Sequence, residues 1–580
     1  MSKDFEADSV KLHKVFEGKD AFYRIPDYQR PYSWGENEIN QLWEDLYEAW
    51  KTAEPGDPEP YFLGSVILID EDRRDDDLGR LDILDGQQRI TTLLIFYTVL
   101  RDCYPGVLDL RPDINRRIIR TIRGDKRYRL QTGSSGKASF IDAVLDEINF
   151  DLDNTYVQSA KLTKNKLDQL FDDTDQIVEF FDFVEDSIEL VLIRSSNLSH
   201  AIRMFQTINT RGKGLTISDL MKSYLLYKTS NLDEREAVID TWKEITVLFN
   251  NNYSAIDSFL SSYRFYRQAA KPEKAVYEEL REDIETRLKE GETVVNIIND
   301  IATYGKAYTT VKNEKTHEIY TLSNLNHGLY WPSILAGANK EGFDDIEALK
   351  HELIAFYYSY WIAGHTAEKI KNPSASIMRR VKRDGTIKSV REKVQKKREK
   401  DSIAQKVQEN LYDDVYRESW HRRLLVSLEY QLRKDGAVSY IEVGEDLHCE
   451  HVLPKAHEKA IEKYDYWSDR FDNKTAAVRK HTLGNIVPLE RELNSSAQIR
   501  GFDEKRDIYL DRYEGDIEGL PEKTTFELTL HLVDTYPEWD ETSIESFRET
   551  IVLETAKLLN FDSSQISKVE EEPISATTVD

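Results

Sequence analysis

A strand, a tight turn and a helix follow one another in the segment that most constrains this chain. Residues 81–84 (LDIL) have a strand pattern, Asp85-Gly86 supplies turn chemistry, and residues 87–103 carry apolar side chains at helical spacing. Upstream, residues 62–69 (FLGSVILI) form an unbroken apolar run that is typical of a buried strand. The amino-terminal part of the chain is therefore expected to mix strands and helices.

The rest of the chain is mostly helical in pattern. Val238, Trp242 and Ile245 fall on one helix face, and similar apolar spacing recurs up to about residue 440. From residue 563 onward the chain is polar and acidic, which is typical of a disordered tail. A length of 580 residues suffices for about three or four domains. We expect an α+β multidomain protein divided into residues 1–230, a helical connecting domain at 231–410, a carboxy-terminal domain at 411–562 and a tail at 563–580.

Cysteine usage and hydropathy indicate a cytoplasmic protein. Cys103 and Cys449 are too few to cross-link a chain of this size, and no basic-then-apolar secretion signal is present. The longest useful apolar run, residues 90–100, falls well short of the roughly 20 residues that a membrane span needs. We therefore expect no membrane partner.

The net charge of −27 argues against a uniformly basic, nucleic-acid-binding surface, yet the charge is segregated. Residues 377–400 hold eleven Lys or Arg and three acids, and residues 111–131 hold eight against two. A solvated helix or loop is the simplest interpretation of residues 377–400. The alternative is a DNA contact inside an acidic body, with four candidate side chains: Arg379, Arg380, Lys382 and Arg383.

A third pattern places an acid and a histidine at the end of one short strand. Glu450 and His451 close this strand, Asn485 lies in a second strand-like piece, and Asn494 follows near a helix start. An acid and an amide oxygen can hold a divalent metal while His451 removes a proton from water. The alternatives are a structural histidine, or a zinc site, for which no second cysteine pair follows. That zinc site would use His448, Cys449, His451 and His457, and His481 is interpreted as a surface or structural residue.

The order of these pieces resembles the ββα-metal HNH nuclease motif, in the variant with Asn at its last position. The matching motifs are EHVLP at 450–454, GNI at 484–486 and LN at 493–494. By position, the resemblance implies that His451 is the general base and that Asn485 orients its ring. Glu450 and Asn494 would ligate Mg²⁺ or Mn²⁺. Glu450 departs from the Asp of many HNH sites, and its extra methylene changes the reach to the metal.

The amino-terminal turn offers a second chemical site. A glycine turn that feeds a helix exposes backbone N–H groups to an anion, and Arg89 could add a charge-assisted contact to a phosphate. Taken alone, such a turn is more often structural. The chain contains no GxxxxGK[ST], which excludes a P-loop. Farther along, residues 200–207 and 218–227 predict two helices around a polar turn, with Ser218 as the N-cap of the second.

Four motifs of this region resemble the ParB-like amino-terminal domain of GmrSD-type modification-dependent restriction enzymes. They are IPDYQRPYSW, FLGSVIL, LDILDGQQRITTL and FQTINTRGKGLTISDLMKSYLL. That family joins this domain to the same HNH subtype and acts against phage DNA that carries modified bases or backbones. The resemblance implies a nucleoside triphosphate pocket lined by Asp85, Gly86, Gln87, Gln88 and Arg89, with Gln29 and Arg30 close by. Asn209, Arg211 and Gly212 would form a second wall or a DNA-facing loop.

Together these resemblances imply an anti-phage, metal-dependent DNA endonuclease with a ParB-like α/β domain and nucleoside triphosphate control. One HNH site cuts one strand at a time, so a clean double-strand break would need a homo-oligomer or two successive nicks. One alternative is a ParB-like DNA-binding regulator with an inactive HNH fold. Another is an abortive-infection nuclease toxin that degrades host DNA or RNA. The sequence identifies neither the nucleotide nor the DNA modification.

Overall fold

The computed structural model describes most of the chain in two compact units. The described residues are 5–18, 21–26, 29, 31–53, 60–70, 80–132, 140–196, 201, 216–325, 330–433, 440–441, 447–512 and 523–568. Unit 1 is Met1–Lys243 and unit 2 is Glu244–Asp580. Among the described residues, no helix combines the length and the apolar character that crossing a bilayer requires.

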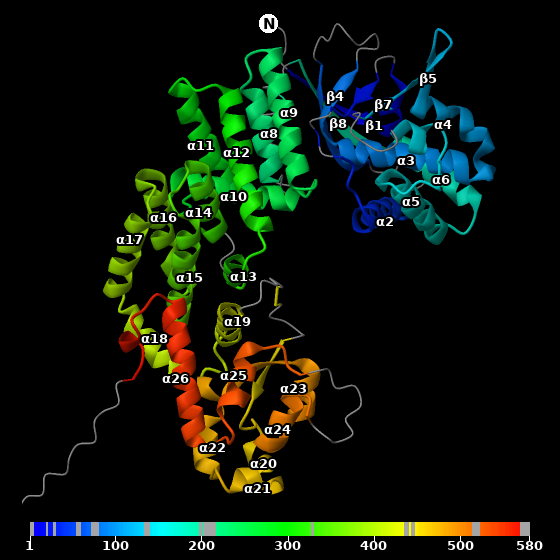
Figure 1. Cartoon of the computed structure of the whole chain (residues 1–580). Helices are drawn as coiled ribbons and strands as arrows, with labels where there is room; N and C mark the ends of the chain where they lie inside the picture. Colours follow the sequence, from blue (N-terminus) through cyan, green and yellow to red (C-terminus); the bar gives the residue numbers. More distant parts are fainter. Residues whose placement is uncertain are drawn as a thin grey trace, which may run out of the picture. The chain divides into compact units, whose positions relative to one another are not determined.

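A mixed sheet is the base of unit 1 (Figure 1). In its described part, six strands form this sheet in the order β1 (Phe5–Lys11), β8 (Ile188–Ser195), β3 (Tyr61–Ile69), β4 (Leu81–Asp85), β2 (Tyr23–Arg24) and β7 (Leu130–Gln131). β3 pairs in parallel with β8 and antiparallel with β4, and β2 pairs in parallel with β4 and β7. A separate antiparallel hairpin joins β5 (Ile119–Ile122) to β6 (Asp125–Tyr128).

Helices bury the core of unit 1 against this sheet. They are α1 (Leu12–Glu17), α2 (Glu36–Thr52), α3 (Gln87–Cys103), α4 (Arg111–Ile118), α5 (Thr155–Leu170) and α6 (Thr174–Ser187), with short turns η1 (Pro105–Leu110) and η2 (Ile141–Leu145). Two further helices follow in the chain, α8 (Ile217–Tyr227) and, at the unit boundary, α9 (Leu232–Leu248). α1 and α6 pack on β1 and β8. α3 is buried along almost its whole length, because its apolar side chains surround the helix. The predicted strands at 62–69 and 81–84 and the helix at 87–103 are confirmed.

The start of α8 differs from its prediction. Thr216, not Ser218, is the N-cap, and its hydroxyl accepts the Asp219 N–H at 3.2 Å. Ser218 lies buried inside the first turn. The predicted helix at 200–207 lies almost entirely outside the described residues.

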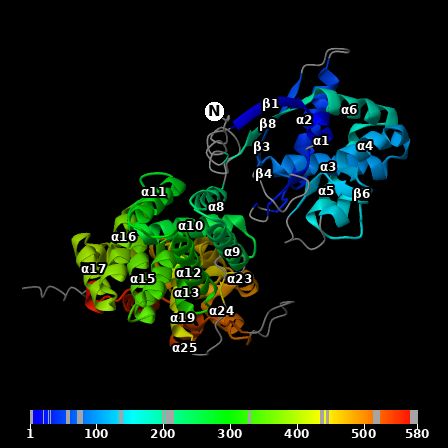
Figure 2. The ribbon, with the colours of Figure 1, turned by 90° about the horizontal axis from the view of Figure 1, so that it is seen from above.

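The first part of unit 2 is helical where it is described, which confirms the helices that the apolar spacing predicted. Its helices are α10 (Tyr253–Gln268), α11 (Val276–Lys289), α12 (Val294–Asn313), α13 (His317–Ser323), α14 (Tyr330–Glu341), α15 (Ile346–Ile362), α16 (Ala367–Asp384), α17 (Ile387–Lys400), α18 (Ile403–Leu411) and α19 (His421–Leu432). Asn252, Thr293 and Asp345 cap three of them by accepting the N–H three residues farther on. α16 and α17 lie side by side in both views (Figures 1 and 2).

The carboxy-terminal part of unit 2 contains one antiparallel strand pair, β9 (Leu447–His451) with β10 (Ile486–Glu490). The helices around it are α20 (His457–Lys463), α21 (Asp465–Ser468), α22 (Asn473–Arg479), η4 (Leu483–Asn485), α23 (Arg491–Ala497), α24 (Phe502–Tyr509), α25 (Glu527–Thr535), α26 (Glu541–Leu558) and η5 (Ser563–Gln565). The predicted order of strand, strand and helix is confirmed.

The predicted start of the disordered tail is wrong. Residues 563–568 are packed: Ile566 is buried, and the Lys568 N–H donates to the Tyr412 hydroxyl at 3.0 Å. An isolated apolar residue in a polar segment carries too little pattern to predict this packing. Residues 569–580 lie outside the described part of the chain.

Candidate active site

The predicted HNH residues lie on and beside the β9–β10 pair: Glu450 and His451 end β9, Asn485 ends η4 directly before β10, and Asn494 lies on α23 after it. His451 pairs with Ile486 across the two strands. Successive strand side chains point to opposite faces, so His448 and Glu450 share one face and His451 takes the other. α23 packs on both strands, and its Asn494 Nδ2 lies 3.5 Å from His448 Nδ1. The acid and the amide predicted to bind metal therefore belong to the same face.

His451 is buried beside a second histidine. Its Nε2 lies 3.1 Å from Nδ1 of His481, and the Tyr416 ring stacks on His481 with a centroid separation of 4.8 Å. Burial, together with the repulsion of a second charge on His481, lowers the pKa of His451 to about 3. The imidazole is therefore neutral at neutral pH, which is the form that accepts a proton from water.

Sequence reasoning missed the partners of His451. His481 was interpreted as a surface or structural residue, yet it contacts the ring of the predicted base. One signal was present: residues that precede the second strand of an antiparallel pair lie near the end of the first strand. Tyr416 lies far from both strands in the sequence, and no local pattern marks it.

Asn485 does not orient the His451 ring, and this prediction is wrong. Its Oδ1 accepts the Leu453 N–H at 2.7 Å and the Trp539 indole N–H at 3.1 Å. Its Nδ2 donates to the carbonyls of Leu453 and Lys480, both at 2.9 Å. Both the oxygen and the nitrogen of this fully buried amide are therefore hydrogen-bonded to the surrounding protein. Asn485 fixes the backbone that follows His451.

Glu450 forms a buried ion pair that the sequence did not reveal. The ammonium of Lys505, on α24, contacts Oε1 of Glu450 and donates to the His451 carbonyl at 3.0 Å. The Tyr509 hydroxyl donates to the same Oε1 at 3.4 Å. Burial raises the pKa of Glu450 and lowers that of Lys505, and their contact opposes both shifts. The contact favours the charged form of each group, while burial, the larger effect on both pKa values, disfavours it.

The donor set on this face fits a hard divalent cation. Glu450 supplies a carboxylate and Asn494 an amide, which are oxygen donors of the kind that Mg²⁺ and Mn²⁺ prefer. Lys505 and Tyr509 both contact Oε1 of Glu450 rather than Oε2. The carboxylate thus keeps an oxygen that the ion pair does not use.

The zinc alternative does not fit. Burial raises the pKa of the Cys449 thiol to about 12. Zinc takes a thiolate, which this environment disfavours. Within the described residues, no group of three or more His, Cys, Asp or Glu side chains is arranged to hold a metal.

The amino-terminal turn joins β4 to α3 in unit 1. Gly86 has φ +89°, and a Cβ there would lie 2.8 Å from a methyl group of Val66, so a glycine is required. Gly86 is the N-cap of α3, which has no acid in its first turn. Arg89 donates to the Leu63 carbonyl at 3.3 Å and lies 3.9 Å from Asp85. The structure thus gathers the predicted residues 85–89 around one helix N-terminus.

Two predicted glutamines tie this turn to the preceding segment. Gln88 accepts the Ser33 N–H at 2.9 Å and donates to the Pro31 carbonyl at 3.3 Å. Gln29 donates to the Leu84 carbonyl at 3.2 Å, which confirms that it lies near the turn. Both side chains therefore fix the turn to the segment at residues 29–33. Gln87 is also buried. The other predicted residues of this site lie outside the described part of the chain: Arg30, Asn209, Arg211 and Gly212.

Comparison with known families decides the membership of this chain. Residues 12–226 match the N-terminal domain of the GmrSD restriction endonucleases, and residues 401–552 match their C-terminal domain. The two matches together cover more than half of the chain. The chain belongs to the GmrSD restriction endonucleases. This confirms the family predicted from the sequence; no curated protein matches the chain.

The GmrSD membership makes this protein a nuclease with DNA as the implied substrate. The N-terminal GmrSD match contains the turn at 85–89, and the C-terminal match contains His451, Asn494 and Lys505. Helices α9 to α17 lie between the two matched segments. The basic stretch at 377–400 belongs to this intervening part of the chain, to which the two GmrSD matches assign no role.

The predicted DNA contacts in this GmrSD chain are occupied by internal partners. On α16, Arg380 and Arg383 pair with Asp384 at 2.8 Å and 2.7 Å. Arg383 remains mostly exposed, but Arg380 is also within 3.5 Å of the Ser389 hydroxyl. The single carboxylate of Asp384 thus pairs with two of the four candidates.

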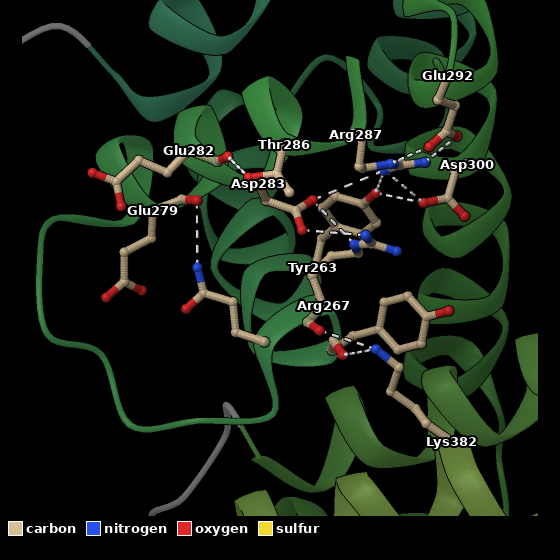
Figure 3. A network of polar contacts seen from close by, with 12 residues as sticks. Tyr263, Arg267, Glu279, Glu282, Asp283, Thr286, Arg287, Glu292, Asp300 and Lys382 are labelled. Atoms are coloured by element: carbon tan, nitrogen blue, oxygen red, sulfur yellow. Dashed lines mark hydrogen bonds and ion pairs between the residues drawn. The ribbon is translucent and has the colours of Figure 1, made fainter. Parts of the chain in front are cut away.

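The other two candidates close the carboxyl end of α10. Lys382 donates to the carbonyls of Tyr266 and Arg267 at 3.1 Å and 3.0 Å (Figure 3). Arg379 donates to the Ala269 carbonyl. Cations are favoured there because the last carbonyls of a helix lack partners and carry the negative end of its dipole. All four side chains thus have internal partners, and their contact with DNA stays a prediction.

Proposed function

We propose that this GmrSD chain is a metal-dependent HNH DNA endonuclease. The observation that carries the proposal is the buried imidazole of His451, which lies at the end of β9 with Nε2 3.1 Å from Nδ1 of His481. Glu450 precedes it in β9, Asn494 lies 3.5 Å from His448 of the same strand, and Asn485 fixes the backbone beyond it. A base, two oxygen donors and a rigid frame are the parts that phosphodiester hydrolysis needs.

The chemistry follows from these positions. His451 accepts a proton from a water molecule whose oxygen attacks a DNA phosphorus, and the bond from phosphorus to the leaving sugar oxygen breaks. When bound by Glu450 and Asn494, Mg²⁺ or Mn²⁺ would stabilise the negative charge that develops on the phosphate. Lys505 opposes the effect of burial on Glu450 and favours its ionised form, and its hydrogen bond to the His451 carbonyl links the two residues.

We infer that the amino-terminal domain is ParB-like and binds a nucleoside triphosphate at the start of α3. The Gly86 turn presents the helix N-terminus without an acid in the first turn, which favours a phosphate group. Asp85 lies beside Arg89 at this turn and is the candidate for holding a metal or positioning water. Nucleotide hydrolysis there would license cutting by the HNH site, and the target would be phage DNA that carries modifications.

The proposal is tested by incubating the purified full chain with modified phage DNA and unmodified plasmid DNA. Each reaction contains Mg²⁺ or Mn²⁺ and one nucleoside triphosphate or none. We expect metal-dependent cutting whose rate changes with one nucleotide and is greater on modified DNA. Cutting that persists in chelator would contradict the metal site. Equal cutting with and without every nucleotide would contradict the regulatory role of unit 1.

A further inference from the structure

A basic cavity of about 390 Å³ lies at α16 and α17, outside both GmrSD matches. No acidic residue lines it, although acids outnumber basic residues in the chain as a whole. Its cationic lining consists of Arg379 from α16 and Lys393, Lys396, Lys397 and Lys400 from α17. All the charged residues of the lining are cationic, which concentrates positive potential at one place in a protein with a net charge of −27.

Three of these lysines are available to a ligand. Lys397 pairs with Asp401 at 2.8 Å, and Arg379 donates to the Ala269 carbonyl. Within the described part of the chain, Lys393, Lys396 and Lys400 form no ion pair or hydrogen bond. In this they differ from the four α16 cations, whose partners are internal.

The spacing of the three lysines fits a chain of phosphates better than a single phosphate. Offsets of three and four residues place them on one face of α17, and they extend over about 10 Å along the helix axis. A nucleic-acid strand offers a negative charge at each nucleotide, so such a row can meet successive phosphates. Asn372 and Ser376 line the same cavity and add neutral hydrogen-bond donors to phosphate or sugar oxygens.

We propose that this cavity is a DNA-backbone binding site in which Lys393, Lys396 and Lys400 contact successive phosphates. The proposal rests on the function proposed above, because it takes DNA as the ligand. Contacts of this kind position the substrate without reading its sequence. The helical segment between the two GmrSD domains thereby holds the DNA while the HNH site cuts it.

The test compares two triple variants of the full chain that remove the same charge. The first is Lys393→Gln/Lys396→Gln/Lys400→Gln. The control is Lys289→Gln/Lys315→Gln/Lys388→Gln, which changes exposed lysines of unit 2 that do not line the cavity. Binding of a fluorescent DNA duplex is measured in chelator, without cutting, over a series of salt concentrations.

We expect the cavity variant to bind at least about tenfold more weakly than wild type. The slope of log affinity against log salt should fall in magnitude by about 2 to 3, since each phosphate contact contributes roughly 0.9. The control should match wild type. Equal slopes for the two triple variants would overturn the proposal. The single variant Lys396→Gln, at an exposed position, should lower the slope by about 1 and guards against misfolding of the triple variant.

The readouts separate this inference from the proposed nuclease function. If wild type binds DNA with the predicted slope but never cuts it, the endonuclease proposal fails and the binding site stands. If wild type cuts DNA and the cavity variant binds and cuts like the control, the binding site fails and the endonuclease proposal stands.

Discussion

His451 Nε2 lies 3.1 Å from Nδ1 of His481, whose ring stacks on Tyr416. Through this contact, a residue of the loop before β10 positions the proposed base. His481→Ala should lower the rate of DNA cleavage between about 10-fold and 100-fold, because a misplaced base transfers protons poorly. DNA binding in chelator should not change. The control is His531→Ala, at an exposed position of α25; equal rates for the two variants would contradict a role for His481.

Asn485 joins the segment after β9 to the rest of the fold through four hydrogen bonds. Asn485→Ala would leave two buried N–H donors and two carbonyls without these partners. The free energy of unfolding should fall by about 3 kcal/mol or more. Calorimetry on the full chain measures this, with Asn473→Ala, at an exposed helix start, as the control. A change within about 0.5 kcal/mol for both variants would show that the amide is not a structural anchor.

The Glu450–Lys505 pair predicts a rescue. Lys505→Met leaves a buried carboxylate without its counter-charge and should destabilise the protein by about 3 to 5 kcal/mol. Glu450→Gln/Lys505→Met removes both charges and should be more stable than the single variant Lys505→Met. Denaturant titration gives the three values. A double variant no more stable than Lys505→Met would mean that the lysine acts through packing and not through charge.

Metal dependence is predicted from the two oxygen donors. A chelator should abolish cleavage, and added Mg²⁺ or Mn²⁺ should restore it. Asn494→Ala should raise the metal concentration needed for half-maximal cleavage by about 10-fold or more, because it removes one of the two proposed ligands. The matched variant Asn473→Ala should leave that concentration as in wild type. If Asn494→Ala and wild type responded alike to metal, Asn494 would not be a ligand.

Local patterns allowed much of the fold to be predicted. The strand, turn and helix at residues 81–103 depend on apolar spacing and on a glycine whose left-handed φ the turn requires. The β9–β10 pair and the helix after it were likewise visible as short apolar pieces in the right order. Such features are encoded within a few neighbouring residues.

The contacts that define the site could not be predicted because they join distant residues. Lys505 meets Glu450 across 55 positions, and Tyr416 reaches His481 from before β9. Lys382 looked like a surface cation, but the end of α10, 115 positions earlier, binds its ammonium. The spacing of charged residues along the sequence does not show which of their side chains find a partner in the folded chain.

The most direct test of the central claim compares wild type with His451→Ala in a cleavage assay at saturating Mg²⁺. The substrate is a DNA that wild type cuts, and binding to it is measured in chelator. We predict that His451→Ala binds DNA as wild type does but cuts it at least about 100-fold more slowly, since it lacks the general base. Equal cutting by the two proteins would contradict the assignment of His451 and, with it, the proposed HNH site.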